Sequence, residues 1–87
     1  MEARRIVGWN VRRIRVIRGI TIEDLAGRAD LDASYVARIE RATVNPSIGV
    51  IEKLGRALGV PLTDLVQVPP RSAHPPKPLR SGRRRAK

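Results

Sequence analysis

Apolar side chains recur every three or four residues through most of the chain, and polar residues occupy the positions between them. This spacing is typical of amphipathic helices that each bury one face. We predict five helices, at about residues 4–18, 22–29, 33–41, 48–58 and 62–67. The fold class is therefore expected to be all-α. The positions expected to face its core are Val7, Val11, Ile14, Ile20, Leu25, Ala26, Val36, Ile39, Ile48, Ile51, Leu54 and Leu58.

Residues with strong helix-end preferences mark the predicted boundaries. Thr21 and Asp24 stand three residues apart and approximate a capping box at the start of the second helix. Gly19 is placed to end the first helix in a left-handed conformation. The remaining signals are Asp30 for a left-handed turn, Leu31 as a buried turn residue, Asp32 and Ser47 as N-caps, and Gly59 as a helix end.

The third predicted helix differs from the others in its outward face. Val36 and Ile39 are expected to point inward, which leaves small and cationic side chains on the other side. Such a face on a short helix that follows a tight turn is typical of a helix that reads the major groove of DNA. The outward residues are Ala33, Ser34, Ala37, Arg38 and Arg41.

Composition narrows the class of protein further. The chain has no Cys and one His, so we expect no disulfide, no metal site and no cofactor. No run of 18 apolar residues is present, which excludes a predicted membrane span. Residues 1–20 carry arginines throughout and do not resemble a signal peptide, so the expected compartment is the cytoplasm.

Charge divides the chain into two parts. Residues 69–87 hold seven cations, no acid and five of the seven prolines, whereas residues 1–68 hold 11 cations and 8 acids. We therefore predict a folded domain over 1–68 and a disordered Pro/Arg-rich tail over 69–87. The tail is expected to track phosphates weakly and without sequence preference; a solubility role and a tether for RNA or an acidic partner are the alternatives.

An ordered set of short segments resembles the Cro/phage-repressor type of helix-turn-helix regulators, the XRE family. The resemblance covers about residues 7–66 and implies a lambda-repressor-like five-helix domain whose second and third helices form the helix-turn-helix. The segments are Val11-Arg12-x-Ile14-Arg15 with Gly19, Thr21-x-Glu23-Asp24-Leu25-Ala26, Ser34 to Arg41 followed by Asn45-Pro46-Ser47, and Leu54-x-x-Ala57-Leu58-Gly59-Val60.

The resemblance and the chemistry of base edges together predict which residues read DNA. The side chain of Arg38 can donate two hydrogen bonds to guanine O6 and N7. Tyr35 either contacts the DNA backbone or packs on the second helix. Ile22 stands where the family commonly has Gln, which leaves its backbone N–H to hold a phosphate. The residues expected to contact bases are Ala33, Ser34, Tyr35 and Arg38.

A rim of phosphate contacts is expected around this helix. The resemblance also implies an ion pair between Arg15 and Glu40 that links the first and third helices. Ala42 stands where the family usually has Gly, so the end of the third helix is predicted to turn less sharply. The predicted phosphate contacts are Arg12, Arg15, Thr21, Ile22, Arg41, Thr43, Asn45 and Ser47.

These expectations combine into a sequence-specific transcriptional regulator that binds double-stranded DNA at a near-palindromic operator as a homodimer. It would be of the phage-repressor, restriction–modification controller or autoregulator type. The alternative is a module that uses the same fold to sequester a protein partner. An enzyme is not expected, because no catalytic cluster is present, and no small-molecule ligand is evident. The predicted dimer interface is Leu62, Leu65, Val66 and Val68; the alternative is that these residues cap the core of the monomer. Trp9 is a second candidate surface.

Overall fold

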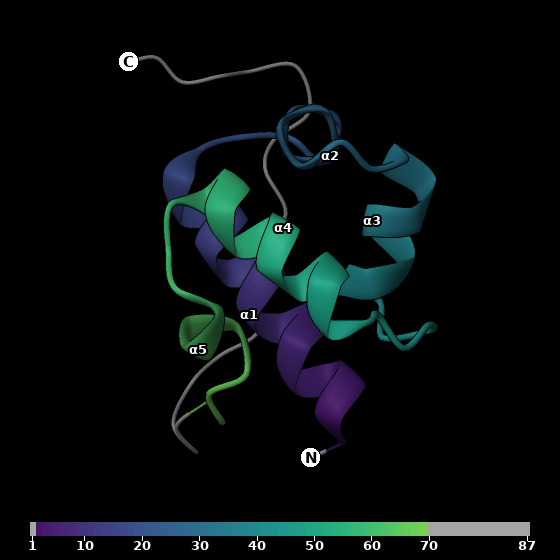
Figure 1. Cartoon of the computed structure of the whole chain (residues 1–87), viewed down its shortest axis with the longest axis vertical. Coiled ribbons are helices and arrows are strands. Elements are labelled where there is room, and N and C mark those ends of the chain that lie inside the picture. Colours follow the sequence, from purple (N-terminus) through teal and green to yellow (C-terminus); the bar gives the residue numbers. More distant parts are fainter. Residues whose placement is uncertain (1, 70–87) are drawn as a thin grey trace.

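The computed structural model describes residues 2–69, in which it contains five helices and no strand (Figure 1). The all-α, five-helix prediction is thus confirmed. The predicted tail, apart from Pro69, lies outside the described residues, and the domain boundary at residue 68 stays a prediction. The helices are α1 (Ala3–Arg18), α2 (Ile22–Ala29), α3 (Ala33–Glu40), α4 (Ile48–Leu58) and α5 (Leu62–Leu65).

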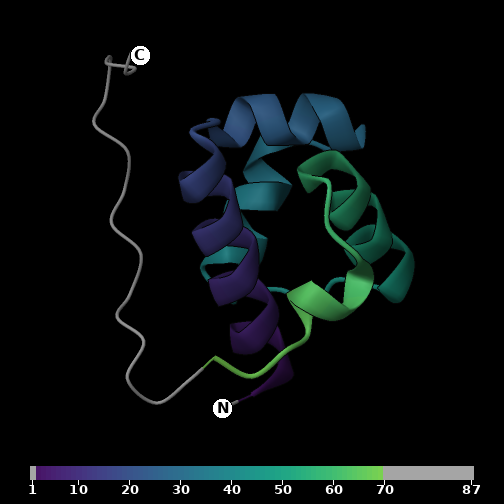
Figure 2. The same ribbon diagram turned by 90° about the vertical axis from the view of Figure 1, so that its left-hand side faces the viewer.

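The five helices surround one aliphatic core. α3 packs on α1 and α2, α4 packs on the same two helices, and α5 packs on α1 and α4. Figure 2 shows α2 across one end of α1 and α5 near the other end. Each helix contributes at least one fully buried side chain, because the apolar face of one helix can be buried only against another element. The side chains with no exposed surface are Val11, Leu25, Val36, Leu54 and Leu65.

The helix ends predicted at Gly19, Thr21, Asp30, Ser47 and Gly59 are confirmed. The Thr21 hydroxyl accepts a hydrogen bond from the Asp24 backbone N–H at 3.0 Å, and the Asp24 carboxylate accepts one from the Thr21 N–H at 3.4 Å. Gly19 ends α1 in the left-handed region with φ 71°, and Asp30 ends α2 with φ 57°. Ser47 caps α4 by accepting from the Val50 N–H at 3.1 Å. Gly59 ends that helix with φ 73°.

Four positions differ in burial from the prediction. The apolar spacing of the first helix also predicts Ile17 or Arg18 on the inward face, yet Ile17 is 70% exposed. Ile48 is 70% exposed, because it begins α4 one turn before Ile51, where the core-facing stripe starts. Leu31 in the turn before α3 is half-buried rather than buried. Ala33 is half-buried and packs against the core, so it does not lie wholly on the outward side of α3.

The prediction that Leu65 belongs to an exposed dimer interface is wrong. Leu65 has no exposed surface and lies in the core, because α5 turns it toward α1 and α4. α5 also ends at Leu65 rather than residue 67, and the exposed apolar side chains come after it. Val66 and Val68 are 47% and 65% exposed.

The end of α3 turns as sharply as it would with glycine, which contradicts the prediction made from Ala42. Ala42 has φ 63°, in the left-handed region that glycine usually occupies. The backbone N–H of Thr43 donates to the Arg38 carbonyl at 3.0 Å, as in a Schellman turn. The packing around this turn therefore holds an L-residue in a conformation that it disfavours.

A buried amide that the sequence analysis did not single out joins α1 to the end of α5. Asn10 is 2% exposed, and its side-chain N–H groups donate to the carbonyls of Leu65 at 3.0 Å and Gln67 at 2.8 Å. These bonds satisfy carbonyls that the short α5 leaves free at its end. The available signal was a polar residue three positions after Val7 and four before Ile14, on the inward face.

Candidate nucleic-acid interface

The orientation of α3 is fixed from behind by a buried ion pair. Arg15 donates from Nε to Glu40 Oε2 at 2.6 Å and from Nη2 to Oε1 at 3.0 Å, and both side chains are less than 10% exposed. Its third nitrogen, Nη1, donates to the Ile20 carbonyl at 3.0 Å. One arginine thus connects α1, the turn that follows it and the last turn of α3. The predicted pair is confirmed.

The same geometry argues against the prediction that Arg15 contacts phosphate. Three of the five guanidinium N–H groups already donate to protein oxygens, and the residue is only 6% exposed. A phosphate would therefore have little access to the two N–H groups that remain. Arg15 therefore positions α3 and does not belong to the exposed rim.

Only some of the residues predicted to contact bases are fully exposed on α3. Ser34 and Arg38 are exposed, whereas Ala33 and Tyr35 are half-buried and pack against the core. This packing corresponds to the second of the two roles considered for Tyr35. The polar side chains classed as exposed over these positions are Ser34 and Arg38.

A third polar group lies beside Ser34 at the start of α3. Asp32 is the N-cap residue, but its side chain makes no hydrogen bond to the backbone of the first turn. Its carboxylate instead accepts a hydrogen bond from the Ser34 hydroxyl. That bond is the main cause of a lowered Asp32 pKa, and the nearby backbone N–H groups of Tyr35 and Ser34 and the charge of Arg38 lower the pKa further. The sequence predicts Asp32 only as a cap, and the Asp-x-Ser spacing was the available signal.

The residues predicted to hold phosphates differ in exposure and in the hydrogen-bond donors they have free. The hydroxyls of Thr21 and Ser47 accept from backbone N–H groups, so each keeps its own hydrogen for an outside acceptor. The Thr43 hydroxyl donates to the Arg38 carbonyl at 3.2 Å and is committed within the protein. Ile22 and Arg12 are half-buried, and Arg12 Nε has no hydrogen-bond partner. The exposed members of this rim are Thr21, Arg41, Thr43, Asn45 and Ser47.

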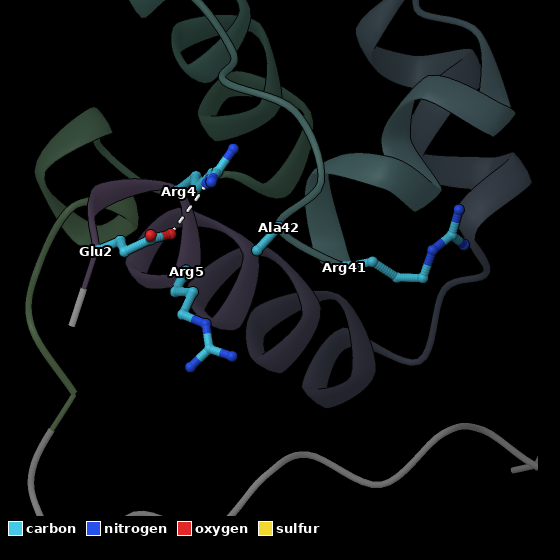
Figure 3. Close-up of a pocket in the computed structure, with 5 residues that line it drawn as sticks. All are labelled: Glu2, Arg4, Arg5, Arg41 and Ala42. Atoms are coloured by element: carbon cyan, nitrogen blue, oxygen red, sulfur yellow. Dashed lines mark hydrogen bonds and ion pairs between the residues drawn. The ribbon is translucent and has the colours of Figure 1, made fainter.

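A shallow hollow lies where the start of α1 meets the turn after α3. Glu2, Arg4, Arg5, Arg41 and Ala42 line it. Figure 3 shows the three guanidinium groups pointing in different directions, and Arg4 donates to Glu2 at 3.0 Å. This hydrogen bond lowers the pKa of the Glu2 carboxyl. Because its cations do not converge, the hollow lacks the geometry of a built anion site.

Residues 2–69 contain neither a membrane-spanning helix nor a metal-binding cluster of side chains. None of the helices there has the length and apolar character needed to cross a membrane. That part of the chain also holds no group of three or more His, Cys, Asp or Glu side chains arranged to bind a metal ion.

Comparison with known proteins identifies the arrangement of α2 and α3. A family model described as helix-turn-helix matches residues 11–65, which contain both helices, α4 and all of α5. The chain belongs to the XRE family of helix-turn-helix transcriptional regulators. The resemblance found in the sequence is thus confirmed over most of its extent.

Similar members of this family include proteins of several bacteria. Control protein C.BamHI of Bacillus amyloliquefaciens is 42% identical over 64 residues, which cover 72% of this chain and 79% of that protein. The crystal structure of a hypothetical transcription factor from Neisseria has a TM-score of 0.76 and 37% identity, and covers 78% of each chain. The restriction-modification controller protein C.AhdI from Aeromonas hydrophila has a TM-score of 0.69 and 35% identity, over 71% of this chain and 94% of that one.

Proposed function

We propose that this XRE-family chain binds an operator sequence in double-stranded DNA through α3 and thereby regulates transcription. The observation that carries the proposal is the arrangement of α3 itself. Its inner face is fixed by Val36, Ile39 and the Arg15–Glu40 pair, while Ser34 and Arg38 stay exposed. A helix held rigidly from behind, with hydrogen-bonding side chains in front, is suited to read base edges in the major groove. The proposed activity is binding, not catalysis.

Within this proposal, Arg38 contacts a guanine and the exposed rim contacts phosphates. Ser34 contributes a second polar contact, and Ala33 and Tyr35 are left with the parts of their side chains that remain accessible. Thr21 and Ser47 each have a hydroxyl hydrogen available to a phosphate oxygen, and the free N–H groups at the start of α2, including that of Ile22, supply backbone donors. Arg12, Arg41 and Asn45 complete the proposed set. Thr43 is left out, because its hydroxyl and its backbone N–H both donate to the Arg38 carbonyl.

We further propose that the protein acts as a homodimer. The exposed side chains of Val66 and Val68 follow shortly after the half-buried Leu62 in the chain, and these apolar residues support an interface at the end of the domain. A two-fold axis would place two α3 helices about 34 Å apart, one turn of DNA, on a near-palindromic operator. The half-buried Trp9, whose indole N–H has no partner, is the competing surface.

The tail supplies a separate, sequence-independent contribution in this proposal. Its seven cations over residues 69–87 would neutralise phosphates and raise affinity for any duplex. The expected place of action is the cytoplasm, where the DNA of a bacterial cell lies.

Selection of bound duplexes from a random pool tests the proposed function. The expected result is an enriched site with two related halves, and affinity for that site that falls steeply and linearly as log salt rises. A pool that emerges without enrichment contradicts sequence-specific binding. A protein that shows neither enrichment nor a salt-dependent affinity for DNA would instead fit the rival function, in which this fold sequesters a protein partner.

A further inference from the structure

We propose that Asp32 is a specificity-determining residue, whose carboxylate accepts a hydrogen bond from the N4 amino group of a cytosine in each half of the operator. This inference rests on the proposed function, since it requires α3 to lie in the major groove. It adds a reader of cytosine to a surface on which Arg38 is proposed to read guanine.

The first support is the placement of Asp32 on the exposed surface. It is the residue immediately before α3, and the N-terminal residues of a recognition helix are those that approach base edges. A carboxylate in the N-cap position usually accepts from the backbone of the first turn. Here it makes no full hydrogen bond of that kind, although the backbone N–H groups of Tyr35 and Ser34 lie close enough to lower its pKa. The side chain lies exposed, so it can still accept from an outside donor.

The second support is the hydrogen bond from Ser34. Because the Ser34 hydroxyl donates to the Asp32 carboxylate, the one hydrogen of Ser34 is directed at the protein. The two side chains therefore present acceptor oxygens to the surroundings and no donor. The lowered pKa of Asp32 keeps the carboxyl ionised at neutral pH, in the form that only accepts.

The third support is the chemistry of the bases. Cytosine offers an amino donor in the major groove that is flanked on its own base by C5–H and not by an acceptor, whereas guanine and thymine offer acceptors there. Adenine offers an amino group next to the N7 acceptor, which would repel the second carboxylate oxygen. A pair of acceptors thus favours cytosine, and Ala33, next in the chain, is too short to compete for the same base.

A carboxylate close to DNA is also repelled by the phosphates, and this repulsion helps the protein to discriminate its operator from other sequences. The repulsion acts at every sequence, and only an amino group placed to donate offsets it. We therefore expect Asp32 to weaken binding to random DNA while it preserves binding to the operator.

The experiment compares wild type, Asp32→Ala, Asp32→Asn and the control Asp30→Asn. The control removes the same charge two residues away, and Asn tolerates the left-handed conformation of Asp30. Each protein selects sites from random duplexes, and affinities are then measured on single-base variants at one salt concentration. Thermal melts followed by circular dichroism confirm folding, and Asn, a good N-cap residue, keeps the test valid if the Ala variant does not fold.

The expected result is confined to one base pair per half-site. Wild type prefers C·G there by about 5- to 150-fold, and Asp32→Ala loses this preference while it binds random DNA more tightly. Asp32→Asn shifts the preference toward adenine, to which Asn can bind through N6 and N7. Asp30→Asn retains the wild-type preference at every position.

Two results overturn the proposal. If both Asp32 variants select the same site as wild type, Asp32 reads no base, although the proposed function stands because wild type still selects a site. If they bind every duplex more tightly by the same factor, the carboxylate is only a repelling charge. A wild-type protein that selects no site at all contradicts the proposed function itself.

Discussion

Gly8 in α1 lies directly against the carbonyl oxygen of Ile39 in α3. A Cβ placed on Gly8 would be 2.5 Å from that oxygen and 2.9 Å from the carbonyl oxygen of Glu40. Both atoms are backbone, so neither can move away by rotating a side chain. The absence of a side chain at Gly8 is therefore what allows α1 and the last turn of α3 to approach so closely.

Replacement of Gly8 by Ala should destabilise the protein by about 1–3 kcal/mol, since overpacking outweighs the gain in helix propensity. Gly27 in α2 is the matched control, because nothing lies within 4 Å of a Cβ placed there. Gly27→Ala should be neutral or stabilising by up to about 1 kcal/mol. Urea titrations of the two variants provide the free energies of unfolding. Equal effects at both positions would show that the approach of α1 to α3 is not tight.

The left-handed turn at Ala42 predicts a stabilising substitution. Ala42→Gly should raise the free energy of unfolding by about 0.5–1 kcal/mol. Glycine removes the strain of the left-handed φ, and this gain exceeds the cost of its greater freedom in the unfolded chain. Ala37→Gly, inside α3, is the control and should lower stability by about 0.5–1 kcal/mol. The comparison uses thermal or urea unfolding. Destabilisation by Ala42→Gly would contradict the φ of 63° at this turn.

The helices and their ends could be predicted because their causes are local. Apolar spacing located all five helices, and Thr21, Asp30 and Gly59 act on neighbouring backbone, so short sequence segments contain their effect. Ile48 is a residue for which apolar spacing predicted burial wrongly. It continues the apolar stripe of α4 in sequence but extends past the edge of the core in space, and sequence spacing alone does not reveal where a core ends.

The parts of the site that depend on distant contacts were predicted less well. The Arg15–Glu40 pair was anticipated from the family resemblance, yet its burial, which removes Arg15 from the DNA surface, follows only from the packing of α1 on α3. Asn10 likewise finds its partners more than 50 residues away. Asp32 illustrates a different difficulty, since a capping residue and an exposed acceptor look identical in sequence.

Near the end of the domain, the buried Leu65 and the exposed Val66 and Val68 should have different roles, in stability and in dimer formation. Leu65→Glu would place a charge in the core and should unfold the protein, with loss of several kcal/mol. The double change Val66→Glu and Val68→Glu alters exposed side chains and should leave the fold intact while it converts dimer to monomer. Circular dichroism reports folding, and sedimentation reports mass. A folded double variant that remains dimeric would move the interface elsewhere, for instance to Trp9.

Arg38→Ala is the sharpest test of the proposed DNA contact. The loss of a two-hydrogen-bond contact to guanine should weaken operator binding by about 1–3 kcal/mol and relax preference at one base pair per half-site. Arg56→Ala, which removes an equally charged exposed side chain from α4, should leave the preference unchanged. Titration of the selected site and its single-base variants measures both effects. Uniform weakening on all duplexes would identify a phosphate contact, and wild-type binding would place Arg38 outside the interface.

The buried position of the Arg15–Glu40 pair has a consequence for how such regulators diverge. The buried side chains that hold α3 in place and the exposed side chains it presents outward are different residues, and only Ala33 and Tyr35 belong in part to both sets. Changes at the outward positions Ser34 and Arg38 therefore leave the buried supporting contacts untouched. A lineage built on this scaffold can acquire new operators by surface substitution with little loss of stability, and the same separation makes α3 a suitable place to graft another recognition sequence.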